Sequence, residues 1–288
     1  MSRSLSSYRS RKRVNVVVDI VCFLAVVLLA ALVLLPIWWI FRSSVMSNPE
    51  IYKFPPYFLP PKWRFSNYPA ALEFFKFGLY LKNTVTIVVP SMVAGTVTAT
   101  LCGYAFARLR FPGKKFLFSL CVGSMFLPPM VTLIPLYTMW TRGLGIHDSY
   151  LPIILPYFCG GGAFNIFLLR QFMMTVPKEL DEAAKIDGAG YLRILVQIIV
   201  PVIRPAMIVV SLLLFIYLWN DLLQQMVYIT KQKDFTIAIG LTIFRGAYKS
   251  DWANLMAATC MSFAPGVLLY LFGQRYFIEG IVMTGMKN

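Results

Sequence analysis

The sequence predicts an all-α, polytopic membrane protein with six transmembrane helices. Its 288 residues are 58% hydrophobic and only 14% charged. Soluble domains are closer to half apolar and a quarter charged, so an excess of this size favours lipid as the surrounding solvent. The apolar residues form continuous blocks and lack the two-residue alternation of barrel strands, which favours helices over a β-barrel.

Each predicted span is a largely apolar block of about 20 residues or more, the length that a helix needs to cross a bilayer. The six blocks lie at roughly 14–40, 84–107, 116–140, 150–172, 201–223 and 256–277. We expect the first block to be a retained helix, because the apolar stretch of a signal peptide is only about 7–15 residues long. Trp38 and Trp39 at its end are typical of an interface anchor.

The distribution of basic residues predicts that both termini lie in the cytoplasm. Six spans place the two termini on one side, and a basic cluster precedes the first span: Arg3, Arg9, Arg11, Lys12 and Arg13. The segments on that side together hold the larger share of the 27 Lys and Arg residues, as the positive-inside rule requires. These residues lie in short segments between apolar blocks, an arrangement that suits membrane orientation better than nucleic-acid binding.

This orientation predicts a cytoplasmic basic N-terminus at 1–13, followed by a single transmembrane domain at 14–288. Outer loops are expected at about 42–82 and 224–253. A cytoplasmic loop is expected at about 173–200, and a cytoplasmic tail at 278–288.

The loop between the fourth and fifth spans predicts a short helix that is exposed on the cytoplasmic face. Pro177 suits a first helical turn, and Glu179, Asp181 and Glu182 follow where the helix dipole favours anions. Gly188 is a natural stop. The properties of these residues are compatible with two interpretations of the helix. It is an interfacial helix that links two spans, or a rigid helix that docks into another protein.

The sequence indicates no catalytic or metal site. The one histidine, His147, lies in a short predicted outer loop, and the five cysteines include no CxxC pair. No GxxxxGK[ST] phosphate-binding loop occurs, so we do not expect the chain to hydrolyse ATP by that machinery. Three glycines at 160–162 lack the lysine of such a loop, and they favour close helix packing or a bend.

The same cytoplasmic loop resembles the EAA signature of ABC importer permeases, which reads E-A-A, three residues, G, nine residues, I-x-L-P. Glu182, Ala183 and Ala184 are followed at these spacings by Gly188 and by 198–201, with Val200 at the usual leucine position. Nearly the whole chain is similar to the carbohydrate-uptake permeases of the maltose-transporter kind. The further matching segments are Asn83 with Thr84, 103–108, 134–137, 218–221 and 274–277.

The resemblance implies a type I ABC importer permease fold and a division of labour among subunits. A second, different permease subunit would pair with this chain around the translocation path. Two cytoplasmic ATPase subunits would bind ATP and Mg, and an extracytoplasmic sugar-binding protein would deliver a sugar or oligosaccharide for import. This chain would bind no cofactor, metal or nucleic acid, and it would lie in the lipid bilayer of the inner or plasma membrane of a bacterium or archaeon.

The resemblance also implies which residues meet the ATPase. The helix from about Lys178 to Gly188 would be the coupling helix, with Glu182 making a polar contact and two small alanines allowing close approach. The tail would make a further contact through Gly285 and Lys287, although it departs from the usual Gly-x-Val-Lys-Gly form. The full set of expected coupling residues is Glu182, Ala183, Ala184, Asp187, Gly188, Ile198 and Pro201. No residue is indicated for substrate binding.

Three alternatives to a sugar importer subunit are compatible with parts of the sequence. An ABC permease for a non-sugar solute, such as glycerol phosphate or a polyol, differs by little that one permease sequence shows. A secondary carrier or channel needs an ionisable relay or filter at mid-depth, whereas Asp19 and Asp221 lie near the ends of spans. An intramembrane enzyme needs converging catalytic groups, which the sequence does not provide.

Overall fold

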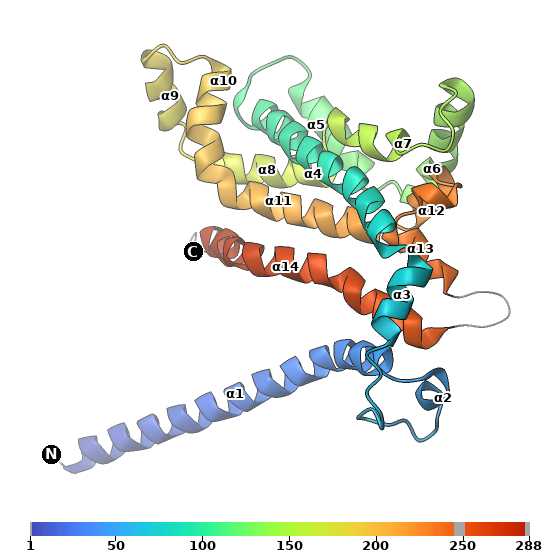
Figure 1. The fold of residues 1–288 in the computed structure, drawn as a ribbon. Coiled ribbons are helices and arrows are strands. Elements are labelled where there is room, and N and C mark those ends of the chain that lie inside the picture. Colours follow the sequence, from blue (N-terminus) through green and yellow to red (C-terminus); the bar gives the residue numbers. More distant parts are fainter. Residues whose placement is uncertain (1, 245–250, 286–288) are drawn as a thin grey trace. The chain divides into compact units, whose positions relative to one another are not determined.

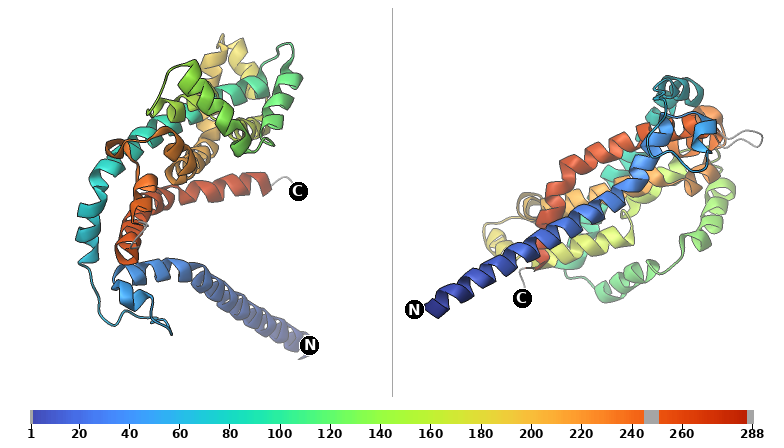
Figure 2. Two further views of the ribbon diagram at one scale, coloured as in Figure 1. Left: turned by 90° about the vertical axis from the view of Figure 1, so that its right-hand side faces the viewer. Right: turned by 90° about the horizontal axis from the view of Figure 1, so that it is seen from below.

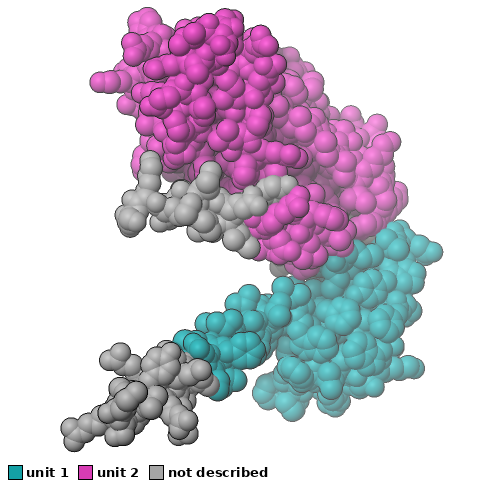
Figure 3. Space-filling view, turned by 90° about the vertical axis from the view of Figure 1, so that its left-hand side faces the viewer, with its two compact units in different colours: residues 1–74, 247–261 teal, residues 75–246, 262–288 magenta. Residues whose placement is uncertain are grey.

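The computed structural model describes residues 2–244 and 251–285, and every regular element within these residues is helical. The prediction of an all-α protein is therefore confirmed. The chain forms two compact units (Figure 3). Unit 1 comprises residues 1–74 with 247–261, and unit 2 comprises residues 75–246 with 262–288.

Unit 1 contains the long helix α1 (Ser2–Ser44), the short helices α2 (Asn48–Ile51) and α3 (Asn67–Phe75), and the beginning of α14 (Trp252–Gly285). The most apolar 18-residue stretch of Val18–Ser44 in α1 has a mean hydropathy of 3.2, and none of this stretch is buried. A helix of this length and hydropathy needs lipid or another apolar surface around it.

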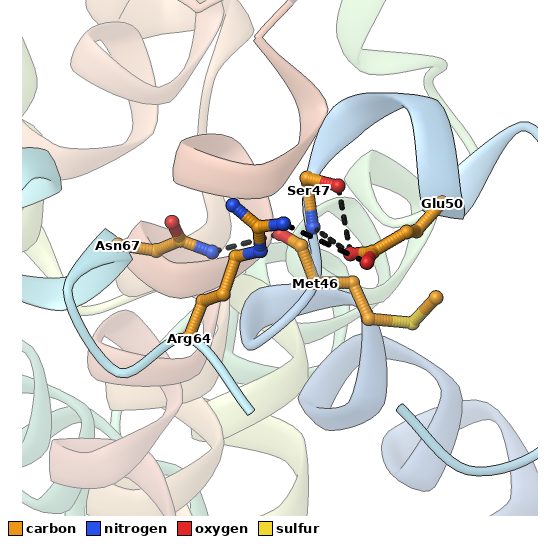
Figure 4. A network of polar contacts seen from close by, with 5 residues as sticks. All are labelled: Met46, Ser47, Glu50, Arg64 and Asn67. Carbon is orange, nitrogen blue, oxygen red and sulfur yellow. Dashed lines mark hydrogen bonds and ion pairs between the residues drawn. The ribbon is translucent and has the colours of Figure 1, made fainter. Parts of the chain in front are cut away.

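The chain after α1 is ordered by polar contacts (Figure 4). The Asn67 side-chain amide donates to the carbonyl oxygens of Ser44 and Met46, at 2.9 Å in both cases. The Glu50 carboxylate accepts the Ser47 amide at 2.8 Å and lies 3.7 Å from an Arg64 nitrogen. The Ser47 amide and hydroxyl lower the pKa of Glu50. These bonds give a fixed local fold to the first part of the predicted 42–82 loop.

Unit 2 is built around α4 (Phe77–Arg108), which packs along α8 (Ala163–Thr175) and α11 (Val200–Asn220). Figure 1 shows α9 and α10 near one end of α11, with α12 and α13 near the other end. The shorter helices are α5 (Lys114–Ser124), α6 (Pro129–Thr138), α7 (Leu151–Ile154), α9 (Glu179–Ile186), α10 (Tyr191–Ile194), α12 (Leu223–Tyr228) and α13 (Ile237–Ile243). The rest of α14 completes the unit.

The six predicted spans correspond to five long apolar segments and one bent pair. Among the described residues, the five segments are Val18–Ser44, Phe77–Arg108, Leu151–Thr175, Tyr191–Asn220 and Trp252–Arg275. The pair is Lys114–Ser124 with Pro129–Gly143, and its two parts are bent by 101°. The right-hand view of Figure 2 shows these green helices on different axes. The break falls at two consecutive prolines, 128 and 129, because proline has no amide hydrogen and disfavours helix in the residue before it.

The fourth span is interrupted by the three glycines at 160–162, which adopt φ values of 120°, 67° and 97°. The interruption brings this span against α4. A Cβ atom on Gly161 would lie 2.0 Å from the carbonyl oxygen of Gly95. The Thr98 hydroxyl donates to the Tyr157 carbonyl at 2.8 Å beside this contact. Both predicted roles of the glycines, a bend and close packing, are present.

The fifth span belongs to a longer helical run. The span was predicted at 201–223, and the helix Tyr191–Asn220 passes through Pro201 without a break. A π-helical turn at Leu195–Ile199 precedes Pro201. Because proline has no N–H for a regular helical hydrogen bond, a local change of helix type lets the chain pass this position without a break.

Candidate functional site

The helix predicted in the 173–200 loop is α9, and its two faces differ sharply. It begins at Glu179, so Pro177 precedes the helix instead of opening its first turn. Asp181 and Ala184, three residues apart, are buried. Glu182 and Ala183 are exposed, and Ile186 is 88% exposed. The outward face of α9 therefore presents Glu182, Ala183 and Ile186 to the surroundings.

The buried face of α9 is fixed to the end of α4 by an ion pair. The Arg108 Nε atom lies 3.2 Å from a carboxylate oxygen of Asp181, and the two side chains are only 4% and 9% exposed. Arg108 also donates from a terminal nitrogen to the Val176 carbonyl oxygen at 2.7 Å. Arg108 therefore contacts both α9 itself and the segment that leads into it. Ala184 packs nearby against the main apolar cluster of unit 2.

Gly188 ends α9 in a Schellman motif. Its amide donates to the Lys185 carbonyl at 3.0 Å, and the Ala189 amide donates to the Ala184 carbonyl at 2.9 Å. Gly188 has a φ of 78°, in the left-handed region that favours glycine. A Cβ at this position would meet no atom within 4 Å, so the constraint is the backbone conformation and not lack of space.

Replacement of Gly188 by alanine is expected to destabilise the end of α9 by about 1–2 kcal/mol, the cost of a left-handed L-residue. The protein should still insert and assemble, with faster amide exchange from Lys185 to Ala189. Hydrogen exchange measured by mass spectrometry checks this result. Gly190 also has open space around it but no positive φ, so Gly190→Ala is the control and should leave exchange unchanged.

The predicted coupling residues do not all share one surface. Glu182, Ala183 and Asp187 are exposed, as is Pro201, while Ile198 is partly buried against the core. Ala184 is 8% exposed, so its small size serves packing within this chain and leaves little surface for a partner. Gly285 is the last residue of α14, and Lys287 lies outside the described residues.

Sequence reasoning did not single out Arg108 or the inward role of Asp181. It also did not single out Leu192, which is 72% exposed close to α9. The matching stretch at 103–108 contained Arg108, but its partner Asp181 lies far away in the sequence. Only the folded arrangement reveals the pair.

A second polar cluster lies near the opposite end of α4. The Asn83 side-chain amide donates to the carbonyls of Lys233 and Phe235, at 2.9 Å each. The Thr84 hydroxyl accepts the Ile237 amide at 2.9 Å. Asn83 and Thr84, which resemble the carbohydrate-uptake permeases in sequence, therefore anchor the segment between α12 and α13. This segment lies within the predicted 224–253 loop.

The same segment is also held by two residues that precede α7, Asp148 and Tyr150. The Asp148 carboxylate lies 2.8 Å from the Lys231 ammonium and accepts the Thr230 amide. The Lys231 ammonium and the Thr230 amide hold the pKa of Asp148 well below its usual range. The Tyr150 hydroxyl donates to the Asp234 carbonyl, and burial with the nearby Asp234 and Asp148 charges raises its pKa to about 12.

Several apolar spans, a fixed helix with an exposed face, and an anchored connecting segment define a multi-pass membrane permease. Residues 92–281 match the family described as binding-protein-dependent transport system inner membrane component. The match covers more than half of the chain, so the protein belongs to this family and to a binding-protein-dependent ABC transport system. As a permease subunit, it is not itself an enzyme.

Individual relatives match over most of their length. A diacetylchitobiose uptake system permease from Streptomyces coelicolor is 31% identical, with 90% of this chain and 85% of the relative covered. An osmoprotective compounds uptake permease from Synechocystis is 34% identical, with 77% and 74% covered. A bacterial ABC transporter involved in the import of the acidic polysaccharide alginate matches in structure with a TM-score of 0.76. It is 25% identical, with 91% of this chain and 96% of that chain covered. The fold is therefore that of an ABC importer permease.

Proposed function

We propose that this chain is the membrane-spanning subunit of an importer that moves a sugar or oligosaccharide into the cytoplasm, and that α9 is its coupling helix. The observation that carries the coupling role is the two-faced geometry of α9. The buried ion pair between Arg108 and Asp181 fixes one face, while Glu182, Ala183 and Ile186 are free to contact a partner. The EAA spacing around Glu182 agrees with this assignment.

In the proposed assembly, both termini and α9 lie in the cytoplasm. Two ATPase subunits bind ATP and Mg, and each docks on the coupling helix of one permease. A second, different permease completes the translocation path. The binding protein approaches the opposite side, where Asn83, Asp148 and Tyr150 hold the segment between α12 and α13.

The sugar is proposed on the basis of relatives whose named substrates are diacetylchitobiose and alginate. A second candidate is a non-sugar solute such as a polyol or glycerol phosphate. The similarity to an uptake permease for osmoprotective compounds supports this second candidate. Purification of the transporter with its binding protein, followed by ATPase assays with sugars and polyols, separates the two classes by the solute that stimulates hydrolysis.

The coupling role is tested by Glu182→Lys. The variant should insert normally but lose both co-purification of the ATPase and uptake, because it reverses a charge on the exposed face of α9. The measurements are recovery of the ATPase with the tagged permease and transport into vesicles. Glu73→Lys on α3, also exposed, is the control with the same charge change. Unchanged ATPase recovery in Glu182→Lys would contradict the assigned role.

A further inference from the structure

A basic cavity of about 270 Å³ lies between α4, α5 and α8 in unit 2. Its cationic lining consists of Lys114 and Lys115 at the start of α5 and Arg170 from α8. The other lining residues are Phe106, Phe118 and Ser119. Within the described part of the chain, three positive charges and no carboxylate line the cavity.

Arg170 is held in position by contacts that leave part of its guanidinium free. Its Nε atom donates to the Phe106 carbonyl at 3.2 Å, and its guanidinium carbon lies 4.1 Å from the centre of the Phe118 ring. Among the described residues, its two terminal nitrogens have no protein hydrogen-bond partner. A guanidinium fixed through Nε presents these terminal donors as a fork that suits the oxygens of a phosphate.

The charges around the cavity repel one another. Lys114 donates to the Leu109 carbonyl at 2.8 Å, and it is repelled by Arg170, Lys178 and Arg110. The nearby carboxylate of Asp181 is already paired with Arg108. Such a concentration of positive charge is stabilised when an anion binds within it.

The position of the cavity indicates where the anion comes from. Arg108 ends one membrane span and Lys114 begins the next helix of the bent pair, so the cavity lies at the level where spans end. The adjacent surface of α5 is apolar, with Phe116, Leu117 and Leu120 exposed by 67%, 48% and 55%. A free phosphate ion makes no use of that surface, whereas the acyl chains of a lipid do.

We infer that this cavity binds the phosphate headgroup of an anionic phospholipid, with its acyl chains lying along α5. Basic pockets between transmembrane helices are suited to such headgroups. The phosphate contacts Arg170 and Lys115, and Lys114 adds long-range attraction. The lipid then joins α5 to α4 and α8 beside the end of α4 that holds α9.

The test is lipid binding to the purified, assembled transporter by native mass spectrometry. Phosphatidylglycerol, phosphatidylcholine and inorganic phosphate are the probes. We expect phosphatidylglycerol to bind preferentially, with an affinity that falls about fivefold in Lys115→Gln and about 25-fold in Lys115→Gln with Arg170→Gln. This follows from about 1 kcal/mol for each basic residue near the lipid surface. Lys115→Gln removes no protein hydrogen bond, so it carries the test alone if the double variant does not assemble.

Lys62→Gln removes the same charge from an exposed site in unit 1 and should leave lipid affinity unchanged. An equal loss in this control would reduce the effect to net charge and overturn the proposal. Equal binding of phosphatidylglycerol and phosphatidylcholine would also overturn it. Displacement of the lipid by millimolar inorganic phosphate would assign the cavity to a free anion. If Lys115→Gln loses the ATPase subunit while its lipid affinity is unchanged, the cavity would be a binding site for the ATPase and not for a lipid.

Discussion

Replacement of Arg108 by alanine is expected to release α9 from the body of unit 2 and to abolish uptake. The Asp181 carboxylate, 9% exposed, would lose its cation, and its second oxygen has no hydrogen bond in the described part of the chain. Breaking a buried ion pair by removing one partner costs about 3–5 kcal/mol, because the remaining charge is left buried and unpaired. The Val176 carbonyl would lose its arginine donor as well.

Limited proteolysis measures this release. Trypsin cleaves after Lys178 and Lys185, which flank or lie in α9, only when the helix opens locally. A loss of 3–5 kcal/mol raises the open population by about 10² or more. Arg193→Ala is the control, because Arg193 is exposed and bonds only to Gln197 among the described contacts. Equal cleavage of Arg108→Ala and the unmodified protein would show that α9 is held by other contacts.

A double variant separates charge burial from the mechanical connection. Arg108→Met with Asp181→Leu removes both charges and keeps apolar volume, a change that is often neutral or stabilising in buried ion pairs. We expect this variant to resist trypsin better than Arg108→Ala. Recovery of uptake would mean that packing alone suffices to connect α9 to α4. Resistance without uptake would mean that the charged pair itself is needed during transport.

In the coupling role that we propose for α9, the ion pair matters because a partner influences a permease only through contacts that differ between two conformations. The contact surface of α9 is small, so movement of a docked partner reaches the spans only if α9 is firmly attached. Arg108 joins α9 to α4, and α4 packs along α8 and α11. Under this proposal, a displacement of α9 would reach α4, α8 and α11 through Arg108.

Much of this architecture followed from local sequence properties. Apolar length predicted the spans, and acids before Gly188 predicted α9, because both depend on residues that are close in sequence. Asp181 was interpreted as an acid that favours a helix N-terminus, which is also true of Glu179 and Glu182. Nothing local distinguishes the acid that turns inward toward Arg108, since that depends on how α9 packs on α4.

The positions and sizes of helix breaks are also only partly predictable from local sequence. Two consecutive prolines, 128 and 129, lie at the 101° bend between α5 and α6, where the helix is broken. At Pro201 the helix continues without a break, and a π-helical turn at Leu195–Ile199 precedes this position. Proline thus marks positions where a regular helix is under strain, and the neighbouring structure decides whether it bends, breaks or continues.

Replacement of Gly161 by alanine is expected to prevent the fold of unit 2 from forming. The added Cβ would lie 2.0 Å from the carbonyl oxygen of Gly95 and 2.7 Å from its carbonyl carbon. Both atoms belong to the backbone of α4, so no side chain can rotate away. The fourth span would have to separate from α4 and lose its core packing. We expect little folded protein in the membrane, measured by fluorescence-detected gel filtration after mild solubilisation.

Gly113→Ala is the matched control, because it separates the steric clash from the backbone conformation. Gly113 has a φ of 75°, close to the 67° of Gly161, but a Cβ there would meet no atom within 4 Å. This variant should lose only the cost of a left-handed L-residue, about 1–2 kcal/mol, and should still yield assembled protein. Similar yields of Gly161→Ala and Gly113→Ala would mean that α4 and the fourth span can move apart at little cost. In that case the glycines at 160–162 would act as a flexible joint instead of a fixed contact.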